Sequence, residues 1–142
     1  MSKRLTVLAA VLAVGLVPVA SAQAATAKPK PRSFSLSFTA AALVPVANTD
    51  DGVVTGSLGK GAIVIVGTDT GRVTVYCAGG SLSAKFKLTI TPNPDNSASY
   101  SGTVTLDTGT GAYKGAKGSG TVSGSIAADG TVTGTAKGKV TY

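Results

Sequence analysis

The sequence has no histidine, no glutamate and no tryptophan, and it has a single cysteine, Cys77. Without histidine, a Ser-His-Asp or Cys-His nucleophilic pair cannot form and no imidazole can bind a metal ion. Without glutamate, any acid–base pair has to come from the six aspartates. A lone cysteine cannot form an internal disulfide. Because Cys77 shares strand parity with Val73 and Val75, we expect a buried, inert thiol rather than one that pairs with another chain. We also expect no cofactor.

The first 24 residues have the three parts of a secretory signal peptide. Two basic residues begin it, residues 5–19 are apolar and uncharged, and an A-x-A cleavage site stands at 22–24. We expect cleavage between Ala24 and Ala25, with residues 20–22 as the second choice of site. A membrane anchor is the competing hypothesis, but a span needs about 20 apolar residues and this run is shorter. The rest of the chain has no second long apolar stretch, so we predict a secreted protein without a membrane span.

Residues 25–32 (ATAKPKPR) are rich in proline and lysine and offer nothing apolar to bury, which predicts a flexible, solvated spacer. A contact with anionic cell wall or lipid is the alternative role for these charges. Five of the 13 cationic residues precede position 33, which leaves eight against six aspartates in residues 33–142, a net charge of +2. This balance is not the clustered basic face that nucleic acids require, so we predict no nucleic-acid partner.

Alternation of apolar and polar residues runs through most of residues 33–142 and predicts an all-β domain. Turn pairs such as Asp-Gly and Gly-Gly separate the alternating runs and favour tight hairpins. About eight short antiparallel strands suggest a barrel or a sandwich, and we favour a closed barrel because it leaves no exposed sheet edges. The strands are expected at 33–40, 53–58, 61–67, 72–78, 81–91, 98–107, 118–127 and 131–142.

Two features depart from this simple alternation. Residues 62–66 (AIVIV) are continuously apolar, which predicts a strand covered on both faces. In the last two expected strands, small residues occupy the presumed inner face. Either they let the wall pack closely against bulky neighbours, the interpretation we favour, or they leave an open lumen. These small residues are Gly118, Gly120, Gly124, Gly134, Ala136 and Gly138, and the bulky ones are Phe34, Phe38, Phe86 and Tyr100. A short helical turn is a further expectation at residues 40–43.

Residues 109–122 have the sequence GTGAYKGAKGSGTV. This segment resembles GTG-x-[YF]-x-GA-x-G-x-GT of the allene oxide cyclase-like and dirigent-like barrel families. The resemblance covers this segment only, and it implies an eight-stranded antiparallel barrel that holds a small apolar ligand in its lumen. It also implies structural roles: Gly109 and Gly111 shape a turn, Tyr113 plugs it, and Gly115 and Gly118 permit tight packing. It implies no catalytic residue.

Candidate site residues are few. Asp107, just before Gly109, is the candidate for a catalytic acid at the barrel mouth. Tyr100 and Tyr113 are candidates for ligand contact, with packing in the core or rim as the alternative. Asn48, Asp50 and Asp51 offer hard oxygen atoms to calcium, but the loop lacks a glutamate and any EF-hand spacing, so we predict no metal site. The remaining aspartates stand in expected turns, where a carboxylate caps backbone N–H groups.

We therefore expect a secreted, non-enzymatic barrel that binds a small apolar ligand or a cell-surface partner. One alternative is a cyclase-like or dirigent-like enzyme that steers a reactive substrate in the lumen, with Asp107, Tyr100 and Tyr113 as its first suspects. Another is a structural or adhesive protein of the cell envelope, with a filled interior. The sequence does not distinguish these three hypotheses, and it does not give the oligomeric state.

Overall fold

The computed structural model describes residues 28–42 and 46–142. The expected signal peptide, its cleavage site at Ala24 and Ala25, and Leu43 of the expected helical turn lie outside these ranges, while residues 40–42 belong to a strand. Residues 28–31 are exposed and have no regular structure.

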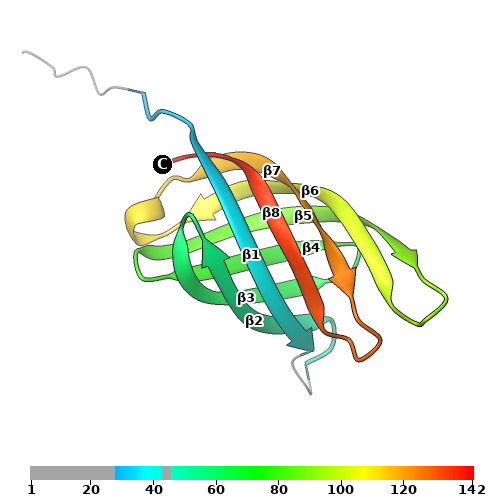
Figure 1. Cartoon of the computed structure of the whole chain (residues 1–142). Helices are drawn as coiled ribbons and strands as arrows, with labels where there is room; N and C mark the ends of the chain where they lie inside the picture. The colour runs from blue at the N-terminus through cyan, green and yellow to red at the C-terminus, as the bar shows by residue number, and fades with distance from the viewer. Residues whose placement is uncertain (1–27, 43–45) are drawn as a thin grey trace, which may run out of the picture.

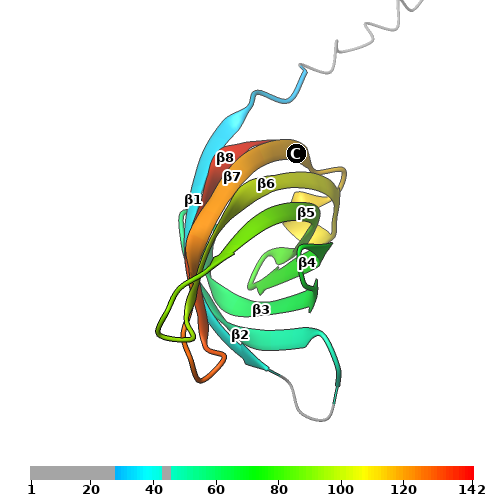
Figure 2. The ribbon, with the colours of Figure 1, turned by 90° about the vertical axis from the view of Figure 1, so that its right-hand side faces the viewer.

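Eight antiparallel strands form a closed barrel, in which each strand pairs with the next and the last returns to the first (Figures 1 and 2). The all-β barrel prediction is confirmed, and all eight expected strands are present. The largest difference is at the second strand, which begins at Thr49 rather than at residue 53. The strands are β1 (Arg32–Ala42), β2 (Thr49–Gly56), β3 (Gly59–Gly67), β4 (Thr70–Cys77), β5 (Gly80–Pro92), β6 (Ala98–Gly109), β7 (Lys117–Ile126) and β8 (Val132–Thr141).

The core lies inside the barrel because successive side chains of a strand point to opposite faces. Inward positions hold apolar side chains, and the outward positions between them are mainly Ser, Thr and Lys. Part of this inner set is buried and part is only half-buried, Phe38, Ile65, Leu88 and Ile90 among the latter. Cys77 belongs to the half-buried part, and its thiol is free. Burial raises the pKa of this thiol, which makes it a poor nucleophile.

The outer face of β3 corrects one prediction. The run 62–66 was expected to be covered on both faces, but Ala62 and Val66 are exposed on the outside of the barrel. Val53 of β2 and Tyr76 of β4 stand in register beside Ala62 and are exposed as well. A single-layered barrel covers only the inner face of its strands, and no second layer of the described chain packs on β3.

The small residues of β7 and β8 provide room for large rings. A Cβ atom on Gly134 would overlap the hydroxyl of Tyr100 and lie 2.9 Å from the ring of Phe38. A Cβ atom on Gly138 would lie 2.8 Å from the ring of Phe34. The expected close packing of aromatic rings against glycine is therefore present.

The two ends of the barrel differ. At one end, which we call the mouth, lie residues 46–48, 68–69, 93–97 and 127–131, each next to the start or end of a strand. At the other end, Tyr113 of the short 3-10 helix η1 (Gly111–Tyr113) is buried and donates a hydrogen bond to the carbonyl oxygen of Leu58 at 3.3 Å. The ring of Tyr142 meets that of Tyr113 edge to face at 5.2 Å, and Ala116 is fully buried nearby. We call Leu58, Tyr113, Ala116 and Tyr142 the plug.

Candidate functional site

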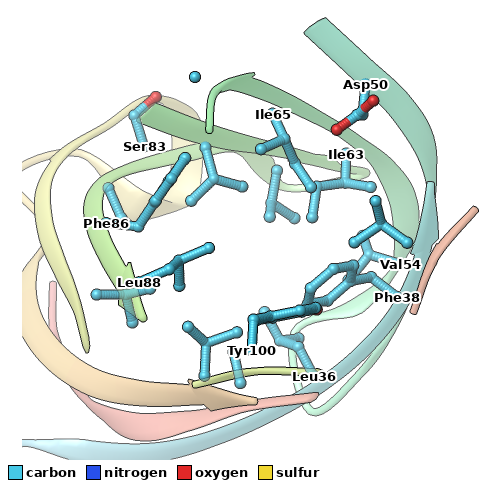
Figure 3. Close-up of a pocket in the computed structure, with 18 of the residues that line it drawn as sticks. Leu36, Phe38, Asp50, Val54, Ile63, Ile65, Ser83, Phe86, Leu88 and Tyr100 are labelled. Carbon is cyan, nitrogen blue, oxygen red and sulfur yellow. The ribbon is translucent and has the colours of Figure 1, made fainter. Parts of the chain in front are cut away.

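The interior of the barrel holds a cavity of about 370 Å³ (Figure 3). Ligand pockets commonly measure roughly 300–1,000 Å³, so this cavity is of the size that takes a small molecule. It extends from Leu58 of the plug to Asp50, Thr68 and Gly130 at the mouth. The barrel interior is therefore tightly packed where Gly134 and Gly138 of β8 meet aromatic rings, and it is hollow elsewhere.

The cavity lining is almost entirely apolar. Figure 3 shows Phe38 of β1, Ile65 of β3, and Phe86 and Leu88 of β5 projecting into a common space. Several of these side chains are half-buried although they point inward, because the cavity exposes them. Among the described residues that line the cavity, four have polar side chains: Asp50, Thr68, Ser83 and Tyr100.

Tyr100 lines the cavity but its hydroxyl group is already engaged. It donates a hydrogen bond to the carbonyl oxygen of Thr133 at 2.9 Å, and the residue is 5% exposed. Burial raises the pKa of Tyr100 to about 12. At neutral pH the phenol is therefore protonated and bound to the barrel wall, which leaves its ring as the part that faces a ligand. Ser83 is similarly engaged, since its hydroxyl lies 2.9 Å from that of Thr74.

Asp50 is the carboxylate that the structure places on the cavity. It lies near the start of β2, beside Ala42 of β1 and Ile65 of β3, and both neighbours are apolar. Burial, followed by the adjacent charge of Asp51, raises the pKa of Asp50. Within the described residues, its carboxylate has neither a hydrogen bond nor an ion pair, so it remains available to a ligand.

The calcium candidates are not brought together. Asp50 points into the barrel, whereas Asp51 follows it in β2 and is exposed on the outer face. Asn48 precedes the strand with a positive φ of 53°. Carboxylates on opposite faces of one strand cannot share an ion. In residues 28–42 and 46–142, no group of three or more Cys or Asp side chains is arranged to hold a metal.

Asp107 lies on the outside of the barrel and not at the mouth. Its carboxylate accepts two hydrogen bonds from the guanidinium of Arg72, at 2.9 and 2.8 Å. This bidentate pair is the first of the contacts that lower the pKa of Asp107. An ionised, paired carboxylate on the outer surface cannot protonate a molecule in the lumen. Tyr113, another of the three candidates, lies in the plug.

The remaining aspartates stabilise turns at the mouth, as the sequence indicated. Asp69 accepts a hydrogen bond from the backbone N–H of Thr70, Asp95 from that of Ser97, and Asp129 from that of Thr131. The hydrogen bonds with Ser97 and Thr131 lower the pKa values of Asp95 and Asp129. Asp95 and Asp129 are consequently ionised at neutral pH and give the mouth a negative charge.

Asp50 was expected only as a calcium candidate, and its place on the cavity was not predicted. The signal was present: Asp50, Gly52 and Val54 have the same parity, and Val54 is a core position. Because the second strand was expected to begin at residue 53, Asp50 was not counted among its inward-facing positions.

No helix of the described residues has the length and apolar character that crossing a membrane requires. A scan against protein-family models finds no match, and searches of curated proteins and of solved structures find none either. The cavity and its lining are therefore the basis for the function proposed below.

Proposed function

We propose that this protein is an exported barrel that binds a small, largely apolar molecule in its lumen. The observation that carries the proposal is the cavity of about 370 Å³, which is lined by apolar side chains and extends to the mouth. An apolar ligand would displace water from this surface, and burial of apolar area contributes roughly 25 cal/mol per Å². The signal-peptide pattern of residues 1–24 supports export. The resemblance of residues 109–122 to allene oxide cyclase-like and dirigent-like barrels agrees with lumen binding.

The positions of the three candidate catalytic residues favour binding over catalysis. Asp107 is paired with Arg72 outside the barrel, Tyr113 is part of the plug, and the hydroxyl of Tyr100 is held by a backbone carbonyl. General acid–base chemistry needs a group within hydrogen-bond reach of the reacting atom, with a pKa near the working pH. A barrel that offers a ligand mainly ring faces and aliphatic carbon is suited to holding it.

The hypothesis of a structural or adhesive envelope protein predicts a filled barrel interior. A protein selected only for its outer surface has no use for a hollow core, because each void forfeits packing contacts in the lining. The cavity is therefore an argument for lumen binding over a purely structural role.

A titration with the neutral fluorescent probe N-phenyl-1-naphthylamine tests the proposal. Saturable enhancement of fluorescence at one site is expected for the unmodified protein. Ala136, on the lumen side of β8, faces the cavity, so Ala136→Phe is expected to abolish the enhancement. Thr135, the preceding residue, is exposed on the outer face, and Thr135→Phe adds a ring of the same kind there without effect. Enhancement that is absent, or that persists in Ala136→Phe, would contradict lumen binding.

A further inference from the structure

The turns at the two ends of the barrel differ in charge. The segments that form the mouth contain Asp69, Asp95 and Asp129, and Asp50 and Asp51 are the second and third residues of β2, which begins at the mouth. No lysine or arginine occurs in residues 43–48, 68–69, 93–97 or 127–131. The plug end carries more basic residues, because Lys60, Lys114, Lys117 and Lys139 lie in or beside the turns there. Lys87 lies beside the mouth turn 68–69, in register with Thr70, and is exposed on the outer face.

The carboxylates of the mouth do not have equal roles. Asp69, Asp95 and Asp129 are engaged in their own turns, so they contribute a field rather than a ligand contact. That field acts over about 8 Å at physiological ionic strength. Among the carboxylates of the described residues, only Asp50 lies on the cavity, and its neighbours across the sheet, Ala42 and Ile65, bear no charge.

An anionic head group is poorly suited to this position. A carboxylate at the mouth would approach Asp50, with Asp51 on the next residue and the charges of three turns around it. Neither lysine nor arginine occurs among the described residues that line the cavity, so none of these side chains could balance a second negative charge. A cationic head group is well suited to this position, since it would form a charge-assisted hydrogen bond with Asp50.

We propose that the ligand is a cationic amphiphile, whose apolar body fills the lumen and whose ammonium group lies at the mouth against the carboxylate of Asp50. This inference rests on the proposed lumen binding and adds the chemical class and the orientation of the ligand. The apolar body of the ligand is inferred from the apolar lining. Its positive head is inferred from Asp50, which lies on the cavity, and from the carboxylates of the mouth around it. The plug fixes the direction of entry, because Tyr113, Ala116 and Tyr142 close the opposite end.

Three ligands of equal chain length test the proposal: decylamine, decanol and decanoate, each measured by displacement of N-phenyl-1-naphthylamine at neutral pH. Decylamine is expected to bind about tenfold or more tightly than decanol, as a hydrogen bond to a charged group contributes roughly 1.5–3 kcal/mol. Decanoate is expected to bind most weakly. In Asp50→Asn the advantage of decylamine over decanol is expected to disappear, while decanol binding changes less than about threefold.

Asp51→Asn is the matched control, because it removes the same charge one residue away on the outer face. It is expected to keep most of the preference for decylamine. Decanoate binding as tightly as decylamine would overturn the proposal, as would an unchanged preference in Asp50→Asn. Those results would leave lumen binding intact, whereas failure of all three ligands to displace the probe would count against lumen binding itself.

Discussion

A leucine at position 136 distinguishes a hollow barrel from a filled one by the sign of its effect on stability. Ala136 lies on β8 in register with Leu36 of β1 and Val122 of β7, and all three side chains line the cavity. Ala136→Leu adds three carbon atoms. Each buried methylene group contributes about 0.8 kcal/mol, so the free energy of unfolding is expected to rise by up to about 2.4 kcal/mol as the leucine occupies empty apolar space.

The assay is urea denaturation of the purified protein, followed by circular dichroism, for the unmodified chain, Ala136→Leu and the outward control Thr135→Leu. Thr135 is exposed, so its substitution is expected to change stability by less than about 0.5 kcal/mol. Inserting carbon into a well-packed core instead costs about 1–3 kcal/mol. A loss of that size in Ala136→Leu, with the control unchanged, would refute the claim that this part of the interior is empty.

Three further outcomes follow from the packing and the charges. Gly134→Ala is expected to lower stability by about 1–3 kcal/mol because its Cβ would overlap Tyr100, while Gly79→Ala, whose Cβ would meet nothing closer than 3.4 Å, serves as the tolerated control in the same urea series. Burial raises the pKa of Tyr100 to about 12, so the stabilising contribution of its protonated phenol is complete below pH 10 and is lost as the pH rises through 12. Ultraviolet titration is expected to show one tyrosine that ionises at this high pH, and this transition is expected to be absent in Tyr100→Phe. Asp107→Asn removes the exposed pair with Arg72 and is expected to leave probe binding unchanged. A loss of binding would contradict the external position of Asp107.

The fold could be predicted from the sequence because its determinants are local. Alternation with period two marks each strand, and the Gly, Asn and Asp residues between the runs provide the backbone conformations that hairpins need. Asn48 and Asn96 do have positive φ values, of 53° and 63°, and Gly130 in the last hairpin has one of 85°. A meander of eight strands joined by short turns then needs only the pairing of β1 with β8 to close.

Two features were predicted wrongly from the sequence: the covering of the outer face of β3 and the position of Asp107. A continuous apolar run states that both faces of a strand are apolar, but it does not state that a second layer exists to cover the outer one. The ion pair of Asp107 joins residues 35 positions apart, and nothing local indicates Arg72 as its partner. Its outward direction was available, however, since Val104 and Leu106 are core positions and alternation places Asp107 on the other face.

The hollow interior was undecidable from the sequence because it depends on how side chains divide the space inside the barrel. Small residues on two adjacent strands indicate either close packing or an open lumen, and here the two are linked. Gly134 and Gly138 let the rings of Tyr100, Phe38 and Phe34 lie directly against the wall formed by β7 and β8. Rings held against one wall leave the centre to the aliphatic side chains of the opposite strands, and these do not fill it. A larger residue at either glycine would push a ring toward the centre, so the glycines that permit tight packing also maintain the cavity.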